Sequence, residues 1–462
     1  MCKMTKKTFV YVKLYLKRAS GNQKTLQLSI VFVTSWFLLL FQIKYSIVSE
    51  LLTILLTQNL KRRKMKIKIA TFRSALKYSE NFLQQQKDFL QAIQKAVGLP
   101  IETAALDDYD CDLKLIFVQT GGSEGLFLQN FAQLQPPYYL LTNGANNSLA
   151  ASLEILTYLK NRQLEGEVLH GDTDHIARRI TQLCKLGKAR KKLADMRLGM
   201  TGKPSDWLIA SVPDYAAVRK LFGTEIEDID LAELENMSKT MHPSQKQLPD
   251  GAFDKSELES SLNIYECVKQ IVEKHRLDGF ALRCFDLLSD VKMTGCMALA
   301  FLNSENTVAT CEGDLMAMLS MCLLRAVCGK PSFQANPSRI ETAENSVVFA
   351  HCTLPLSMTE SFKLDTHFES GIGVAVRGKM HVGDVTVLRL SSDLKHYFLS
   401  SGQITGNLEE DNLCRTQIRV HLDEDVKLLL QRPCGNHHVI CYGNCCDSVE
   451  MLLDSYGLVR VR

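Results

Sequence analysis

The sequence is short of the long apolar runs and nucleotide-binding loops that define several large protein classes. Residues 28–41 (LSIVFVTSWFLLLF) form a run of fourteen apolar or small residues, whereas a membrane-spanning helix needs about 20. The glycine-rich turn at residues 120–125 (TGGSEG) lacks the G-K-[ST] of a phosphate loop and the G-x-G-x-x-G of a dinucleotide-binding turn. The chain shows no internal repeat and no low-complexity segment. These absences count against an integral membrane protein, a nucleotide site at this turn and a repeat protein.

Acidic residues are almost missing from the first 64 residues, which carry twelve Lys/Arg and the single acid Glu50. Their charge of +11, against +3 for the whole chain, leaves −8 on the remaining 398 residues. A mildly acidic body disfavours binding to nucleic acid. The front segment has three interpretations: an over-extended reading frame ahead of Met65, which we favour, a membrane anchor, or a targeting peptide. We expect no membrane association unless residues 28–41 are a real anchor.

Disulfide bonding is not indicated, although the chain has fifteen cysteines. They are scattered through apolar runs, such as residues 321–324 (MCLL), in the way that reduced cysteine is used as a small apolar residue. An exported protein would pair many of them, so we predict a reducing, cytoplasmic compartment. A zinc site is left open as an alternative, although its candidate ligands contain no C-x-x-C pair. These candidates are Cys434, Cys441, Cys445 and Cys446.

From Met65 onward, short apolar runs alternate with helical ones, which predicts parallel sheets wrapped by helices. Strands are expected in the first unit at residues 67–72, 113–118, 138–141 and 167–170. In the second unit they are expected at residues 207–212 (WLIASV), 225–229 and 279–284, with a long helix over 254–274. After residue 330, short strands between Gly, Asn and Asp turns predominate.

This organisation predicts an α/β protein in which two α/β units precede a β-rich, barrel-like C-terminal domain. The expected boundaries are 1–64 for the basic and apolar extension, 65–197 and 198–330 for the α/β domains, and 331–462 for the β-rich domain.

Four short stretches in the last third of the chain carry carboxylate and imidazole groups, which are ligands for divalent metals. They are residues 311–314 (CEGD), 350–352 (AHC), 365–369 (DTHFE) and 435–438 (GNHH), and seven of the eleven histidines follow residue 350. Glu312 and Asp314 precede an apolar helix, where acids meet the helix dipole favourably. Glu312 also falls at a strand–helix junction, where α/β enzymes place catalytic groups.

The histidines of these stretches have structural explanations as well as functional ones. His351 ends an apolar strand, where a lone histidine is more often a satisfied core residue. His367 has Asp365 and Glu369 at i−2 and i+2, so in extended chain the three side chains share one face. A surface strand face explains that pattern equally well. Only one residue of the pair 437–438 can face inward from a strand, so only one is expected to be a ligand.

The order and spacing of these stretches resemble the L-fucose isomerase/L-arabinose isomerase superfamily, most closely its shorter fucose-isomerase-like branch. The matching words are CEGD at 311–314, FAHC at 349–352, THFESGIG at 366–373 and GNHH at 435–438. The resemblance runs from about Met65 to the C-terminus. It implies two Rossmann-like domains followed by a β-rich domain, aldose–ketose isomerisation with Mn²⁺ (or Mg²⁺ or Co²⁺), and a homo-oligomer.

The resemblance also implies roles for individual residues. Glu312 matches the family's glutamate that binds the metal and moves the proton. The implied metal ligands are Glu312, His351, His367 and His438. The candidate substrate contacts are Arg283, Asn336, Asn436 and His437, and for Arg283 a structural ion pair is an equal alternative.

One expected acid is missing from the sequence. Arabinose isomerases have a second catalytic glutamate where this chain has Leu354, and fucose isomerases have an aspartate ligand near Asn336. Asp365 and Glu369 are the candidates to replace it, and Asn336 is a candidate weak ligand. We predict a metal-dependent isomerase of a pentose, hexose or 6-deoxyhexose, acting through an enediolate. The alternative is a catalytically incomplete sugar-binding or regulatory protein on the same fold.

Overall fold

The structure is a computed structural model that describes residues 65–246 and 253–462. Contacts divide the chain into the units Met1–Lys64 and Met65–Arg462. The predicted anchor or targeting segment at residues 28–41 lies outside the described residues. Among the helices that the structure describes, none combines the length and apolar character needed to cross a membrane. Since residues 65–462 form one compact unit, their division at 197/198 and 330/331 stays a prediction.

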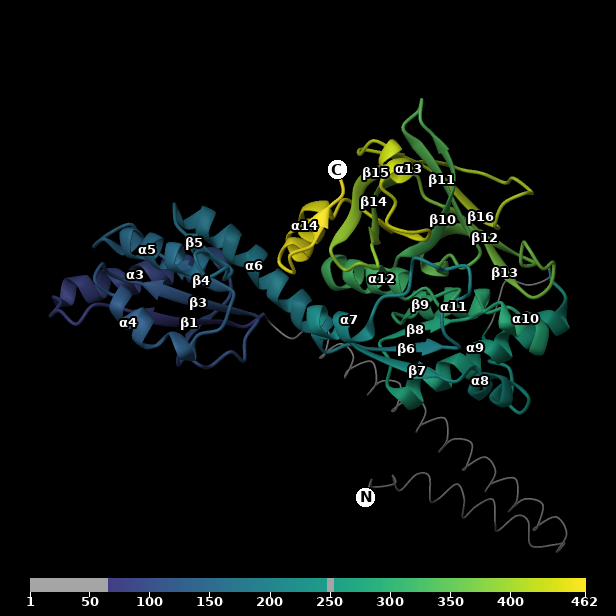
Figure 1. The fold of residues 1–462 in the computed structure, drawn as a ribbon, viewed down its shortest axis with the longest axis horizontal. Coiled ribbons are helices and arrows are strands. Elements are labelled where there is room, and N and C mark those ends of the chain that lie inside the picture. Colours follow the sequence, from purple (N-terminus) through teal and green to yellow (C-terminus); the bar gives the residue numbers. More distant parts are fainter. Residues whose placement is uncertain (1–64, 247–252) are drawn as a thin grey trace, which may run out of the picture. The chain divides into compact units, whose positions relative to one another are not determined.

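A five-stranded parallel sheet of order β2-β1-β3-β4-β5 forms the first α/β layer (Figure 1). Buried apolar runs form its central strands, and their side chains pack against α3 and α6 on one face and α4 and α5 on the other. The strands are β1 (Ile67–Phe72), β2 (Ile101–Thr103), β3 (Leu113–Val118), β4 (Tyr138–Leu141) and β5 (Gly166–Leu169). The helices are α3 (Glu80–Val97), α4 (Glu124–Gln129), η1 (Phe131–Gln133), α5 (Ser148–Lys160) and α6 (Thr173–Ala194).

A four-stranded parallel sheet of order β7-β6-β8-β9 forms the second layer. Its faces are covered by α12 on one side and by α9 and α11 on the other. The strands are β6 (Arg197–Thr201), β7 (Glu225–Ile229), β8 (Gly279–Leu282) and β9 (Val308–Thr310). The helices are α7 (Tyr215–Phe222), α8 (Leu231–Ser238), α9 (Lys255–His275), α10 (Asp286–Asp290), α11 (Cys296–Ser304) and α12 (Leu315–Cys328).

The C-terminal region is an antiparallel barrel of six strands in the order β14-β17-β10-β11-β16-β15, closed by pairing of β15 with β14. A parallel strand, β18, extends β15, and β12 and β13 form a separate hairpin. The strands are β10 (Phe333–Glu341), β11 (Ser346–His351), β12 (Thr359–Asp365), β13 (Ala375–Met380), β14 (Gly383–Leu390), β15 (His396–Asn407), β16 (Thr416–Leu422), β17 (His438–Tyr442) and β18 (Val459–Arg460). The helices are η2 (Leu356–Met358), α13 (Lys427–Gln431) and α14 (Cys446–Asp454).

The predicted fold class is confirmed: two parallel-sheet α/β layers precede a barrel. Helix α12 packs on β8 and β9 through one side and on β14 and β17 through another, so it connects the second sheet to the barrel (Figure 1). One predicted strand is wrong, because residues 207–212 form turns and irregular chain in which Ile209 is 91% exposed. Its apolar side chains do not enter a sheet, and Trp207 instead packs edge-on against Phe285.

Candidate metal and sugar site

Glu312 is placed by a sharp turn between β9 and α12, at the carboxyl edge of the second sheet. Glu312 and Gly313 both have left-handed backbones, with φ of 62° and 63°. A side chain at Gly313 would lie 2.5 Å from the carbonyl oxygen of Lys203, so glycine is needed for this close approach. The backbone N–H of Ser205 donates to the carbonyl of Glu312 at 2.9 Å. Ligands of open α/β sheets bind at this edge.

Three neighbouring barrel strands bring further polar residues to the same place. In the order β17-β10-β11, Ala335 pairs with His438, and Asn336 pairs with Ala350. His437 immediately before β17, Asn336 on β10 and His351 at the end of β11 therefore lie at the same end of three neighbouring strands.

Glu312, His351 and His437 form a compact buried group whose ligand atoms all lie within 4.8 Å of one another. Oε1 of Glu312 is 3.3 Å from Nε2 of His437 and 3.7 Å from Nε2 of His351. The Nδ1 atoms point away from this centre, to Asp314 Oδ2 at 2.8 Å from His437 and to Thr353 Oγ1 at 2.9 Å from His351. Both Nε2 atoms and a carboxylate oxygen thus converge on one point.

The electrostatics of the group favour a cation at that point. Burial opposes the charge on Glu312, but the adjacent imidazoles of His351 and His437 hold its pKa below the ordinary value of a glutamate. Burial also works against an imidazolium at His437, but Asp314 and Glu312 raise its pKa to about 9. His437 Nε2 is buried and makes no hydrogen bond. The Glu312 carboxylate beside this unpaired nitrogen, with Asp314 on the other nitrogen of the ring, fits a divalent metal ion, which would take the place of the proton.

A buried ion pair fixes the orientation of His437. Asp314 accepts from Nη1 of Arg389 at 3.0 Å through Oδ2, and both side chains are fully buried. Burial opposes its charge, but Arg389 and His437 keep the pKa of Asp314 below its usual range. Arg389 is itself held by Ser211, whose Oγ accepts from Nη2 at 2.6 Å. The carboxylate thereby directs Nε2 of His437 toward Glu312, as carboxylate–histidine pairs do in metal sites.

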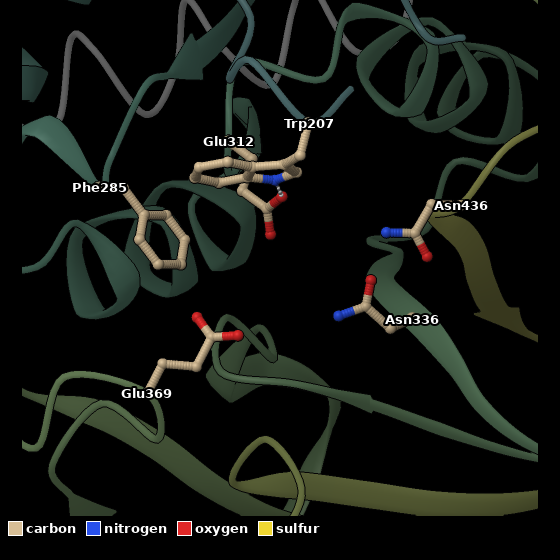
Figure 2. A pocket seen from close by; sticks show the side chains of 6 residues that line it. All are labelled: Trp207, Phe285, Glu312, Asn336, Glu369 and Asn436. Atoms are coloured by element: carbon tan, nitrogen blue, oxygen red, sulfur yellow. Dashed lines mark hydrogen bonds between the residues drawn. The ribbon is translucent and has the colours of Figure 1, made fainter. Parts of the chain in front are cut away.

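A cavity of about 540 Å³ opens next to the group and is lined by Trp207, Phe285, Glu312, Asn336, Glu369 and Asn436 (Figure 2). This volume is within the range of small-molecule sites. The indole N–H of Trp207 donates to Oε2 of Glu312 at 2.5 Å, which leaves Oε1 toward the histidines. Glu369 directs its carboxylate into the same space from the β12–β13 side (Figure 2). Oδ1 of Asn336 is buried and has no hydrogen-bond partner, so it is available to a ligand.

The structure separates the predicted site residues into two sets. It brings Glu312, His351 and His437 together and places Asn336, Asn436 and Glu369 around the cavity. Asp365 instead accepts from Arg377 at 2.9 Å, and Arg283 is paired with Asp206 and Asp286. Both are held in ion pairs, and neither is among the residues that line the cavity.

Two predicted metal ligands lie outside the compact group. His367 lies on the loop between β12 and β13, away from the barrel strands that carry the compact group. Its Nδ1 is 3.0 Å from Oγ of Ser370, and its ring packs against Phe285. His438 points into the barrel between Phe349 and Phe398. Adjacent residues in extended chain face opposite sides, so His437 lies beside Glu312 and His438 does not.

The sequence did not lead us to predict Trp207 and Phe285 in the cavity. It also did not predict the ion pair between Arg389 and Asp314. Trp207, one of two tryptophans in the chain, was assigned to a strand. The one sequence signal for Trp207 was its position shortly after the turn residues Gly202-Lys203-Pro204. Arg389 lies inside an apolar strand, and its partner Asp314 is 75 residues away.

The burial of His438 makes a pH-dependent contribution to stability. Burial lowers the pKa of His438 to about 3, with Arg389 adding to the effect. A group with a lowered folded-state pKa stabilises above its unfolded value of about 6.5 and loses that contribution as pH falls. We expect the free energy of unfolding of the wild type to fall, relative to His438→Gln, by up to about 1.4 kcal/mol per pH unit below about pH 6.5.

Chemical denaturation of the two proteins between about pH 7 and pH 4.5 measures this difference. His421, an exposed histidine on β16, provides the matched control. His421→Gln should follow the wild type throughout, and parallel curves for the wild type and His438→Gln would contradict the assignment.

Comparison with known proteins identifies relatives among the sugar isomerases. No family model matches the chain. The chain is 22% identical over 329 residues to the sulfoquinovose isomerases of Priestia aryabhattai and Priestia megaterium, covering 67% of this chain and 73% of those proteins. It is 22% identical over 195 residues to the sulfoquinovose isomerase of a Clostridium species, covering 39% and 43%. The chain is thus related to enzymes that interconvert aldoses and ketoses, which confirms the predicted enzyme class.

Proposed function

We propose that this protein is a metal-dependent aldose–ketose isomerase. The convergence of Glu312, His351 and His437 on one point beside a sugar-sized cavity is the observation that carries the proposal. Carboxylate and imidazole ligands suit Mn²⁺, and Mg²⁺ or Co²⁺ are substitutes. The ion would polarise the sugar carbonyl and stabilise the negative charge of the enediolate.

The protein's own residues would supply positioning and proton transfer. Isomerisation removes a proton from one carbon of the open-chain sugar and returns it to the neighbouring carbon. Glu312 and Glu369 approach the cavity from opposite sides (Figure 2), so they are the proposed pair of carboxylates. Glu369 then takes the place of the acid that the sequence lacks at Leu354. Asn336 and Asn436 would bind sugar hydroxyls, and Trp207 would hold the Glu312 carboxylate in position.

The lining of the cavity favours an uncharged sugar. The relatives are named for sulfoquinovose, a hexose with a sulfonate group. Glu369, which lies outside the proposed metal group, gives this cavity a negative group that repels a sulfonate. The guanidinium of Arg283 is already paired with Asp206 at 2.9 Å and Asp286 at 2.8 Å. We therefore propose a neutral pentose, hexose or 6-deoxyhexose as substrate. We also propose that the protein is a cytoplasmic homo-oligomer.

Ketose formation from a panel of neutral aldoses and from sulfoquinovose, with Mn²⁺ and with chelator, tests this function. The expected result is turnover of at least one neutral aldose that requires the metal and exceeds turnover of sulfoquinovose. Preference for sulfoquinovose would refute the neutral-sugar proposal. Polyol binding without turnover of any sugar would refute the isomerase and favour the sugar-binding alternative.

His437, immediately before β17, and His438, the first residue of β17, allow a direct test of the metal site. We expect His437→Gln to weaken Mn²⁺ binding at least about 100-fold, because it removes a ligand that the fold has already oriented. His438→Gln, one residue away, should bind Mn²⁺ as the wild type does. Isothermal calorimetry on both variants measures the affinities. Equal losses would mean that the strand alternation does not select the ligand.

A further inference from the structure

Three cysteine side chains meet at the opposite end of β17 from His437. Cys328 ends α12, Cys441 lies on β17, and Cys445 immediately precedes α14. Their Sγ atoms all lie within 4.8 Å of one another. In a tetrahedral zinc site, with Zn–S bonds of about 2.3 Å, neighbouring sulfur atoms are roughly 4 Å apart. The three thiols therefore already have nearly the spacing that a bound ion requires.

The fold produces this arrangement from strand alternation and one short turn. His438 and Ile440 face the barrel interior, whereas Val439 and Cys441 pack toward α12, which places Cys441 beside the end of that helix. Cys441 and Cys445 are separated by three residues, a spacing found for two zinc ligands on one turn. The third ligand comes from a part of the chain 113 residues earlier, which the sequence spacing does not reveal.

The turn between the two cysteines is held in a fixed conformation. Gly443 has φ of 89°, and its carbonyl accepts from Oγ1 of Thr386 at 2.8 Å. The backbone N–H of Cys445 donates to the same hydroxyl at 2.8 Å. Thr386 on β14 is fully buried, so the turn is anchored to the barrel. The thiols are consequently preorganised, which lowers the entropic cost of binding an ion.

Charge and access are also suitable for a cation site. Nζ of Lys330 donates to the carbonyl of Tyr442 at 3.1 Å, and a Cβ atom at Gly443 would lie 3.1 Å from it. Three thiolates around a divalent ion carry one net negative charge, which this ammonium group offsets. Cys328 and Cys445 are partly exposed, so an ion and a water ligand can reach the sulfur atoms.

We propose that Cys328, Cys441 and Cys445 bind a soft divalent cation of the zinc type, separately from the Glu312 site. All fourteen cysteines that the structure describes are free thiols, and packing as small apolar groups accounts for most of them. Three thiols in mutual contact at a partly exposed position match a thiolate ligand set more closely. The ion joins the end of α12 to β17 and the start of α14, and therefore stabilises the contact between the α/β layers and the barrel.

Cadmium titration of the full chain, stripped of metal and kept reduced, tests the site. Cadmium–thiolate bonds give an ultraviolet charge-transfer band, whereas carboxylate and imidazole ligands do not. We expect one equivalent of Cd²⁺ to saturate the band in the wild type and in Glu312→Gln. The band should be lost in Cys441→Ser and in Cys445→Ser. Cys111→Ser, which removes a partly exposed thiol elsewhere, should retain it.

Several results would overturn the proposal. These are absence of the band in the wild type, its persistence in both Cys441→Ser and Cys445→Ser, or its equal loss in Cys111→Ser. Circular dichroism of each variant tests whether it is folded. Because Cys445 is partly exposed, we expect its substitution to leave the core intact. As a second readout, Zn²⁺ should raise the melting temperature of Glu312→Gln but not that of the double variant Glu312→Gln/Cys445→Ser, in which both proposed sites are altered.

Discussion

Glu312→Gln is expected to lower kcat at least about 1,000-fold, because it removes both a proposed proton-transfer group and a charged metal ligand. The amide keeps the size of the side chain and can still accept from the indole N–H of Trp207. The loss would therefore report the charge and not the packing. Mn²⁺ affinity should fall together with kcat, and calorimetry beside steady-state assays of ketose formation measures both quantities.

Glu369→Gln is the matched control, since it changes the other carboxylate of the cavity. Its side chain is about half exposed and lies outside the group formed by Glu312 and the histidines. We expect a fall in kcat of about 100-fold or more, with Mn²⁺ affinity unchanged. Full activity of Glu369→Gln would place the second acid elsewhere, and unchanged Mn²⁺ affinity of Glu312→Gln would contradict the proposed ligand set.

Asp314→Asn is expected to cost about 3–5 kcal/mol of folding free energy, because it leaves Arg389 charged and unpaired in the protein interior. Asparagine still caps α12, where Oδ1 of Asp314 accepts from the N–H of Ala317 at 2.8 Å. The effect would therefore come from the lost charge. The variant should also bind Mn²⁺ about 10- to 100-fold more weakly, since His437 loses its orienting carboxylate.

A second substitution separates these two effects. The double variant Asp314→Asn/Arg389→Met removes the unpaired charge, so it should recover part of the stability without recovering Mn²⁺ affinity. Glu410→Gln, which breaks an exposed pair with Arg339, should cost less than about 1 kcal/mol. Denaturant unfolding and calorimetry measure the outcomes. A small stability loss in Asp314→Asn, similar to that of Glu410→Gln, would contradict the importance of the buried pair.

Local sequence patterns predicted most of the regular elements for clear physical reasons. The largely apolar segment that became β3 is buried on both faces, and a largely apolar run is the signature of such a strand. The predicted helical segment at residues 254–274 became α9, with Asp254 as its N-cap. The segment at residues 207–212 failed because its apolar residues serve other purposes. Trp207 covers Glu312, and Ile209 is exposed.

The candidate site was predicted only in part. Glu312 was identified from its place at a strand–helix junction and from the family resemblance, whereas His351 was identified from the resemblance alone. The choice between His437 and His438 depends on which face of β17 meets the second sheet, and the sequence does not encode that choice locally. Asp365 and Glu369 have the same local pattern, yet Arg377 takes Asp365 into an ion pair while Glu369 reaches the cavity.

The sequence by itself determined the α/β layers, the β-rich C-terminal region and the set of side chains from which a metal site could be built. These follow from periodicity, turn residues and residue chemistry, which are properties of short segments. The tertiary structure decided which of those side chains meet. Packing of α12 between the second sheet and the barrel brings together Asp314 and Arg389, and also the three cysteines around β17. Trp207 and Glu312 meet on two loops that follow strands of the second sheet. These contacts join residues that are 75 to 113 positions apart in the chain. Contacts over such separations depend on the whole fold, so the sequence pattern alone could not specify them.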